Sequence, residues 1–471
     1  MRRAFAGVLV VIGLLASALA EPATPKQPAG PGAGSNIAAR AKVYATSSLP
    51  GHPAEHAIDD SAETAWRAAN ADAVLWLDFG ARMRLAGLSH VIRAGDSEPA
   101  ATEIVTWQNG WTPIGQTAGR GEPVVAKVQA NTQYIGIRSS AGSAGRPLTI
   151  ETLRAFQAGW RPQRDGKDLR LQDFCFFRHD GYTYIGSMMK DFGHEGITIA
   201  RSRDLIDWEP LGIAVSRRTP EDKAMLWAPH VVEHAGEFHM FYTGVTQPKP
   251  NHWNQKILVA TTKDPANPKE WQRNHAVKFI VDGRTESWFR PSHPGHVWPA
   301  DGWADCRDPM VYYNPPDRTW YLFYSGSDTT GGIVGVATAP NILGPWEDRG
   351  PVLCVDRGVP ESAFVLPDPA GGYVMVINHS TPDRIDGGIK IARARSLLPE
   401  NGKPSFTGLE LLEPSAEPGL VGWAHEFAMN PDGTVLAAYL TGYFINFQDA
   451  RFVKGKGGWT VSGIPETTGP K

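Results

Sequence analysis

The feature that most constrains the fold is a hairpin unit that recurs after residue 165 and opens with an acidic residue. Copies begin at Asp173, Asp308 and Glu361, with the runs Asp-Phe-Cys-Phe-Phe, Asp-Pro-Met-Val-Tyr-Tyr and Glu-Ser-Ala-Phe-Val-Leu. In each copy a polar turn rich in Asp, Pro or Gly and a second apolar run follow, which is typical of a β-hairpin. If the units close into a ring, the three acidic residues point toward one central place.

Further apolar runs complete the units. Runs that end at Trp208, Trp271 and Trp346 close the first three, residues 388–394 close the fourth, and a fifth begins near Trp423. We therefore expect an all-β chain in which residues 165–465 form a five-bladed β-propeller. Residues 245–300 hold few strand signals and are expected to form part of the cleft.

The chain before the repeat divides into three parts. Arg2, Arg3, the apolar run 8–15 and Ala18-Leu19-Ala20 have the layout of a signal peptide, so we expect residues 1–20 to be removed and the protein to be secreted, to a periplasmic or extracellular space. Residues 21–35 are a Pro/Gly/Ala linker. Residues 36–157 alternate short apolar runs, such as 74–79 and 88–92, with turns, which predicts a β-sandwich.

Composition narrows the classes of function. The formal net charge is −3 for the chain and −5 without residues 1–20, so no basic surface for nucleic acid is expected. No run is long enough for a membrane span. The three cysteines allow one disulfide at most, and we expect Cys175 and Cys306 to be buried thiols. We expect a monomer.

Carboxylates gathered at a propeller axis suit the cleavage of glycosidic bonds. An inverting glycosidase needs a general base that activates water and a general acid that protonates the leaving oxygen. A third carboxylate nearby keeps the acid protonated, because like charges resist ionising together. Two Asp and one Glu would supply all three groups.

Residues 165–465 resemble glycoside hydrolase family 43, a member of a wider superfamily with families 32 and 68. The resemblance rests on Trp227-Ala228-Pro229-His230, on Asp308-Pro309, and on the positions of Glu361 and Asp173. It implies that Asp173 is the base, Asp308 the residue that raises the pKa of the acid, and Glu361 the acid. It also implies a polysaccharide or oligosaccharide substrate, with arabinose or xylose as the default expectation.

The chain also departs from the family pattern. Phe174 follows the first Asp in place of Pro, and Ser362-Ala363 follows Glu361 in place of Gly-Pro. Arg307-Asp308-Pro309 is similar to the Arg-Asp-Pro of the related retaining, fructan-cleaving propellers, whose Asn-Asp-Pro-Asn start is absent here. Two alternatives therefore stay open: a non-catalytic glycan-binding propeller, and a retaining fructan-type glycosidase.

Other residues are candidates for the walls of the site. We expect substrate contacts from Trp227, His230, Arg307, Trp298, His425 and Glu426. The resemblance places a histidine of the fifth blade near a central ion or water, so His425 is also a candidate metal ligand, with a core histidine as the alternative. His230 could instead be structural, and Arg307 could pair with Asp308. No cofactor is expected to be required; a structural Ca²⁺ ion is an option at the axis or in the sandwich.

Residues 36–157 resemble a discoidin-type module, the fold of carbohydrate-binding module family 32. The matching segments are Ala45-Thr46-Ser47-Ser48, Ala57-Ile58-Asp59-Asp60, Thr64-Ala65-Trp66 and Leu77-Asp78-Phe79-Gly80. The resemblance implies a carbohydrate-binding role for this domain, although the same module also serves as a protein- or lipid-binding fold.

Overall fold

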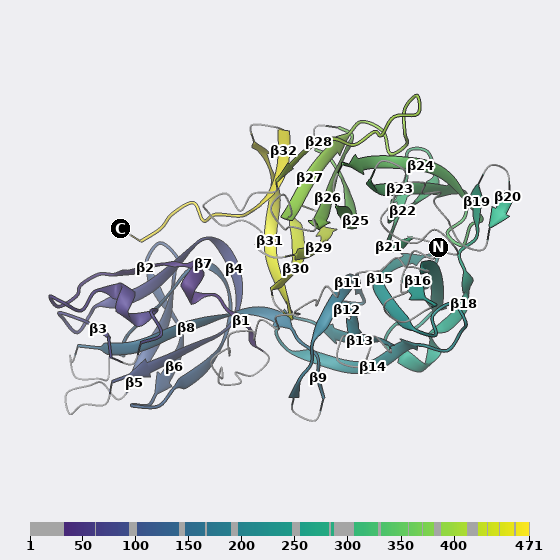
Figure 1. Ribbon diagram of the computed structural model, residues 1–471. Coiled ribbons are helices and arrows are strands. Elements are labelled where there is room, and N and C mark those ends of the chain that lie inside the picture. The colour runs from purple at the N-terminus through teal and green to yellow at the C-terminus, as the bar shows by residue number, and fades with distance from the viewer. Residues whose placement is uncertain are drawn as a thin grey trace, which may run out of the picture. The chain divides into compact units, whose positions relative to one another are not determined.

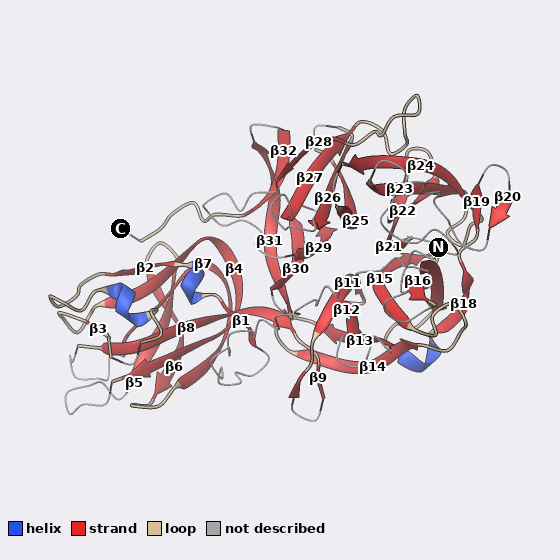
Figure 2. Cartoon of the chain, in the orientation of Figure 1, coloured by secondary structure: helices blue, strands red, loops and turns tan. Residues whose placement is uncertain are grey.

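The computed structural model describes residues 33–470 except for positions 62, 94–100, 141–146, 165–166, 190–195, 247–254, 282–283, 287–305, 328–330, 357, 370, 381–387, 412–422, 431, 442 and 456–457. These residues belong to one unit, residues 31–471. Strands dominate (Figure 1 and Figure 2), and the helices of the described part are three short 3-10 helices, η1 (Ala38–Arg40), η2 (Ala54–Ala57) and η3 (Pro268–Glu270). None of the helices in these ranges has the length and apolar character needed to cross a membrane.

Five antiparallel meanders, here called blades 1 to 5, follow one another along the chain. Blade 1 contains β11 (Leu171–His179), β12 (Tyr182–Met189), β13 (Gly196–Ser202) and β14 (Trp208–Ser216). Blade 2 contains β15 (Met225–His234), β16 (Glu237–Val245), β17 (Gln255–Thr262) and β18 (Gln272–Ala276). Blade 3 contains β21 (Arg307–Asn314), β22 (Thr319–Ser327), β23 (Gly332–Ala339) and β24 (Trp346–Val355), and is widened by β19 (Phe279–Val281) and β20 (Arg284–Glu286).

The last two blades repeat the pattern. Blade 4 contains β25 (Val359–Pro367), β26 (Tyr373–Ser380), β27 (Gly388–Ala394) and β28 (Thr407–Leu411). Blade 5 contains β29 (Trp423–Met429), β30 (Val435–Thr441), β31 (Phe444–Gly455) and β32 (Gly458–Gly463). Blades 1 to 4 are separate sheets, whereas blade 5 belongs to a larger sheet that continues into the N-terminal domain.

The first strands of the five blades contact one another in a closed ring. β11 contacts β15, β15 contacts β21, β21 contacts β25, β25 contacts β29, and β29 contacts β11 again. This arrangement is propeller-like and confirms the all-β fold class that the repeat predicted.

Each blade packs against neighbours on both faces, which explains why its strands read as continuous apolar runs. On β11, Phe176 packs with Phe447 of blade 5, whereas the preceding residue, Cys175, packs with Leu226 of blade 2. The two-residue period of a strand sends successive side chains to opposite faces, and both faces must be apolar here. Cys175 and Cys306 are buried in such cores between blades, as predicted.

The N-terminal domain is built on two long strands, β4 (Val74–Ile92) and β7 (Val124–Ser139). Its other strands are β1 (Ala33–Asn36), β2 (Lys42–Ala45), β3 (Trp66–Arg67), β5 (Ala101–Trp107), β6 (Trp111–Ala118) and β8 (Thr149–Trp160), and the hairpin of β9 (Gln163–Arg164) and β10 (Lys167–Asp168) leads to blade 1. The prediction of separate strands at 74–79 and 88–92 is wrong. The register shifts between Asp78 and Met83, and Gly80 takes a φ of 72°, so one strand bends without ending.

Because of the bend, the two halves of β4 pair with different strands of the same sheet. Before the bend β4 pairs with β2 and the end of β7; after it, β4 pairs with β8 and the start of β7. One apolar core lies inside and includes Leu75, Leu85 and the fully buried Trp66. The Trp66 indole N–H donates to Ser48 Oγ at 3.0 Å, so this large side chain is buried without an unpaired donor.

The N-terminal domain and blade 5 share one hydrogen-bonded sheet. β8 extends to Trp160, past the expected domain boundary at residue 157, and pairs there with β31. Gly159 lies opposite Asn446, and Trp160 lies opposite Ile445. A side chain at position 159 has no space, because a Cβ there would lie 2.2 Å from the carbonyl oxygen of Ile445.

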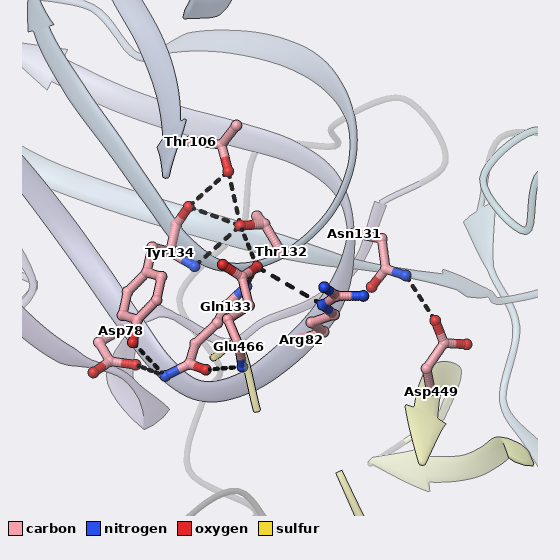
Figure 3. Close-up of polar contacts among 9 residues, drawn as sticks. All are labelled: Asp78, Arg82, Thr106, Asn131, Thr132, Gln133, Tyr134, Asp449 and Glu466. Atoms are coloured by element: carbon pink, nitrogen blue, oxygen red, sulfur yellow. Dashed lines mark hydrogen bonds and ion pairs between the residues drawn. The ribbon is translucent and has the colours of Figure 1, made fainter. Parts of the chain in front are cut away.

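Side chains add to this junction. The guanidinium of Arg84 on β4 donates to both carboxylate oxygens of Asp449 on β31, at 2.8 and 3.0 Å. The side chain of Asn131 donates to the same carboxylate at 2.7 Å (Figure 3). Bidentate arginine–carboxylate pairs of this kind fix geometry as well as adding energy.

The segment after β32 returns to the N-terminal domain. The backbone N–H of Arg82 donates to the carbonyl of Ile464 at 2.8 Å. Glu466 accepts hydrogen bonds at Oε1 from Thr132 Oγ1, at 3.2 Å, and from the backbone N–H of Gln133, at 2.9 Å (Figure 3). The last described residues are therefore fastened to β7.

Gly159→Ala should destabilise the protein by about 1–3 kcal/mol, because the added methyl group must push β8 away from β31. Gly110→Ala is the matched control, since its Cβ would meet nothing within 4 Å. Thermal unfolding of both variants measures the effect. Equal melting temperatures for the two variants would show that the β8–β31 pairing adds little stability.

Candidate active site

The first strand of every blade has an irregularity near its start. The register shifts between Leu171 and Phe174 in β11, and at the corresponding places in β15, β21, β25 and β29. In each case two residues lie between the paired positions. Such a β-bulge releases residues from the ladder and redirects their side chains, which is why bulges often accompany functional sites.

In four of the blades the first bulge residue adopts left-handed backbone angles. The φ values are 41° for Ala228, 53° for Asp308, 50° for Ser362 and 51° for Ala424. A residue with a Cβ in this region costs about 1–3 kcal/mol and persists only where its surroundings hold it.

In three of these four bulges, the backbone N–H of the first bulge residue donates a hydrogen bond to the preceding blade, which stabilises the conformation. The N–H of Asp308 donates to Thr243 Oγ1 of blade 2 at 3.1 Å, and the N–H of Ala424 donates to Asn378 Oδ1 of blade 4 at 3.1 Å. The N–H of Ser362 donates to Asp308 Oδ2 of blade 3 at 3.1 Å. Each of these bulges is thus bonded to the preceding blade.

The three acidic residues occupy three successive bulge positions rather than one shared position. Glu361 is the last paired residue before its bulge, where blade 3 has Arg307 and blade 2 has Trp227. Asp308 is the first residue inside its bulge, and Asp173 is the second. The sequence analysis placed the three residues at one equivalent position, and this is wrong. Relative to Asp308, Glu361 lies one position earlier in its strand and Asp173 lies one position later. Successive residues of a regular strand face opposite ways, but a bulge relaxes this rule.

Asp308 is buried and held from two sides. Its Oδ2 accepts the hydroxyl of Ser325 at 3.2 Å and the N–H of Ser362 at 3.1 Å, and Arg307 Nε lies 3.8 Å from the same oxygen. Burial raises the pKa of Asp308 to about 6; the charge of Arg307 opposes this rise and the charge of Glu361 adds to it. Asp308 is therefore a fixed carboxyl that gains a proton in mildly acidic solution.

Glu361 is more accessible than Asp308, with 35 % of its side chain exposed against 8 %. Arg307 Nη2 donates to Oε1 at 3.0 Å, and the hydroxyl of Ser380 donates to Oε2 at 2.8 Å. Both oxygens thus act as acceptors, as in an ionised carboxylate. Arg307 lies between Glu361 and Asp308 and contacts both carboxylates. This agrees with the alternative expectation, that Arg307 pairs with Asp308.

Asp173 belongs to the same electrostatic group. Burial raises its pKa well above the usual range, and the charges of Asp308 and Glu361 raise it further, while Arg307 opposes them. The structure thus brings together the three acidic residues that the sequence singled out, around one arginine. Within the described part of the chain one guanidinium, that of Arg307, faces the three carboxyl groups, so the neutral acid form is favoured at the buried ones.

A fourth carboxyl group lies beside them. Glu426 Oε2 is 4.0 Å from His230 Nδ1, and these residues hold matching positions directly after the bulges of blades 5 and 2. Burial raises the pKa of Glu426 well above its usual range, with a further contribution from Asp173. Burial also lowers the pKa of His230 to about 4. The Nε2–H of neutral His230 donates to the Val311 carbonyl at 3.2 Å, which leaves the Nδ1 lone pair toward Glu426.

The remaining expected residues are placed differently. Trp227 is half-buried at the position that matches Arg307. His425 is buried and stacks on Phe427 and Tyr439, with ring centroids 6.0 and 5.6 Å apart. Within the described part of the chain no group of three or more His, Cys, Asp or Glu side chains could hold a metal ion, so no ligand set accompanies His425. Trp298 lies outside the described residues.

Sequence reasoning missed the hydroxyl groups that support the carboxylates. Thr243 and Ser325 hold corresponding places on the second strands of blades 2 and 3, opposite Trp227 and Arg307. Both sit in a repeated motif, Phe-Tyr-Thr-Gly and Phe-Tyr-Ser-Gly, in which a small hydroxyl residue follows an apolar and aromatic run. That recurring polar residue was the available signal.

The sequence model of "Glycosyl hydrolases family 43" matches residues 169–293, which include Asp173 and blade 2. No curated protein matches the sequence of this chain. Among solved structures, a thermostable family-43 glycoside hydrolase is 19% identical, with a TM-score of 0.44, over 66% of this chain and 98% of the other. An endo-1,4-β-xylanase from Bacteroides thetaiotaomicron is 18% identical, with a TM-score of 0.43, over 63% and 95%. A family 32 β-fructofuranosidase from Bombyx mori is 14% identical, with a TM-score of 0.44, over 62% of each chain.

The raised pKa of Asp308 sets a pH dependence of stability. The folded chain binds this proton more tightly than the unfolded chain, whose value is near 3.8, so the free energy of unfolding should fall as pH rises from about 4 to about 6. Asp308→Asn cannot ionise. Its free energy of unfolding relative to the wild type should therefore rise by roughly 2–3 kcal/mol across that window and then level off. Urea unfolding between pH 4 and 7 measures the difference.

Asp204→Asn is the control of opposite sign. Although burial acts to raise the pKa of Asp204, hydrogen bonds from the N–H groups of Asp207 and Ile206 hold it below the usual range. The wild type should therefore gain stability over Asp204→Asn as pH rises through the region below about 4, so urea unfolding of this pair is extended down to about pH 2. A difference between wild type and Asp308→Asn that stays constant with pH would contradict the assignment for Asp308.

Proposed function

We propose that this chain is a glycoside hydrolase that cleaves glycosidic bonds in a polysaccharide or an oligosaccharide. The observation that carries the proposal is the group of Asp173, Asp308 and Glu361 around Arg307, at the bulges of the innermost strands. Paired carboxyl groups of different protonation are what glycoside hydrolysis requires. The match of residues 169–293 to the family 43 model supports the same class of reaction.

In the proposed reaction Asp173 is the general base and Glu361 the general acid. The base removes a proton from water as the oxygen attacks the anomeric carbon, and the acid gives its proton to the leaving oxygen as the glycosidic bond breaks. Asp308 touches neither water nor substrate in this scheme. Its charge raises the pKa of Asp173, and its bonds to Ser325 and Ser362 keep it in place.

A second assignment of the two roles has its own support. Glu361 accepts hydrogen bonds from Arg307 and Ser380, whereas the pKa of Asp173 is raised well above its usual range. In the resting protein the proton therefore favours Asp173, which would make Asp173 the acid and Glu361 the base. In the first assignment, bound substrate must displace Arg307 from Glu361 so that Glu361 can be protonated.

The finer parts of the proposal follow from resemblance. An arabinose- or xylose-containing polymer is the default substrate, the reaction is inverting, and the protein is secreted. The N-terminal domain is proposed to bind carbohydrate, as discoidin-type modules of carbohydrate-binding module family 32 do. The competing functions are a retaining fructan-type glycosidase, which the Arg307-Asp308-Pro309 motif favours, and a non-catalytic glycan-binding propeller.

Incubation with a panel of plant and bacterial polysaccharides tests the function, with release of reducing sugar as the readout. On the best substrate, we expect the first product seen by proton NMR to carry the inverted anomeric configuration, because water attacks the face opposite the leaving group. Initial release of the retained anomer would reassign one carboxylate as a nucleophile. Binding to a glycan without product from any of them would favour the non-catalytic alternative.

Glu361→Gln should lower kcat by roughly 10²–10⁴-fold on substrates with poor leaving groups and much less on activated aryl glycosides, since only the former need a proton. Asp173→Asn should slow both kinds equally. Glu347→Gln, at an exposed position on β24, is the control and should retain full activity. The reverse pattern for the two variants would establish the second assignment. Equal effects of both variants on both substrates would exclude a distinct acid and base.

A further inference from the structure

A cleft of about 460 Å³ lies away from the carboxyl groups. It is lined by the turn between β11 and β12, the turn between β13 and β14, and Arg84 from the N-terminal domain. Arg178 on its wall is on the same strand as Asp173, five residues later, which is about 17 Å along an extended chain. The volume is in the range of small-molecule sites.

Three arginines, Arg84, Arg178 and Arg203, line this cleft. Arg84 is neutralised by its bidentate pair with Asp449. Arg178 donates to the neutral amide oxygen of Asn430 at 2.7 Å. The Arg203 guanidinium lies 4.1 Å from the centroid of the Tyr182 ring. Within the described ranges, neither Arg178 nor Arg203 forms an ion pair.

Asp180 and Asp204 also line the cleft, but in the described part of the chain neither forms an ion pair with Arg178 or Arg203. Asp204 is occupied at Oδ1 by the N–H groups of Ile206 and Asp207, at 2.9 and 2.8 Å, and at Oδ2 by Gln129, at 2.9 Å. Asp180 is exposed at the hairpin turn, with a φ of 48°. Burial and the like charge of Arg84 lower the pKa of Arg178, whereas the charge of Asp449 opposes this change. Arg178 and Arg203 therefore present guanidinium groups to the cleft that form no ion pair with a described carboxylate.

We propose that this cleft binds the anionic group, carboxylate or sulfate, of an acidic saccharide, with Arg178 and Arg203 as its ligands. Guanidinium groups present paired donors that match the two oxygens of a carboxylate or a sulfate. The Tyr182 ring holds Arg203 in position, and Arg201 covers the same ring at 4.4 Å. The anion follows from these contacts alone; the saccharide rests on the proposed function.

Titration calorimetry of the full chain at constant ionic strength tests the proposal, with glucuronic acid, glucose 6-sulfate and glucose as probes. None of them contains a glycosidic bond, so the measurement is independent of hydrolytic activity. At least one anionic sugar should bind, and glucose should not. Binding of the glucuronate alone identifies a carboxylate ligand, and binding of the sulfate alone identifies a sulfate ligand. Glucose binding as tightly as both anions, or no binding by either, would overturn the proposal.

Variants locate the site. Arg178→Gln and Arg203→Gln should each weaken binding of the anionic sugar at least tenfold, and Arg203→Lys, which keeps the charge but loses the paired donors, should have an intermediate effect. Arg395→Gln removes one exposed arginine of blade 4 and should bind as the wild type does. Melting temperatures of the unliganded variants show whether they are folded. Wild-type affinity in folded Arg178→Gln and Arg203→Gln would place the anion elsewhere and refute the assignment.

Discussion

The bulge at the start of each innermost strand is the constraint on which the rest of the structure depends. A buried amide that leaves a ladder must find another acceptor. In blades 3 and 5 the acceptor is a polar side chain on the second strand of the preceding blade, Thr243 or Asn378. In blade 4 it is Asp308 itself. The bonds that fasten one blade to the next are therefore also the bonds that fix the central carboxyl group.

Charge imbalance is the second organising fact. Arg307 faces Asp308 and Glu361 and also affects Asp173, so among the described residues one cation interacts with three acids. Burial removes the water that would otherwise stabilise the surplus negative charge, and the remaining way to reduce it is to bind protons. Glu361 accepts the shorter contact from Arg307, while burial raises the pKa of Asp308 and Asp173.

The repeated pattern of apolar runs was enough to predict an all-β, propeller-like chain, because strands buried on both faces have a distinctive composition. It also singled out Asp173, Asp308 and Glu361. It could not set their register, since a bulge adds a residue without changing composition. It also divided β4 at Gly80, because a bend and a turn use the same residue type. The hydroxyls of Ser325 and Ser380 reach their carboxylates across neighbouring strands of one blade, and no local pattern marks their partners.

The pairing of β8 with β31 has a consequence for the order of folding. β8 is made long before β31, and until blade 5 exists the end of β8 near Gly159 is an open sheet edge that could pair with another chain. Blade 5 must therefore close the ring against β11 and cover this edge in the same late step. A chain stalled before residue 444 would carry two unfinished edges, so nascent chains of this protein should depend more on chaperones than a lone propeller would.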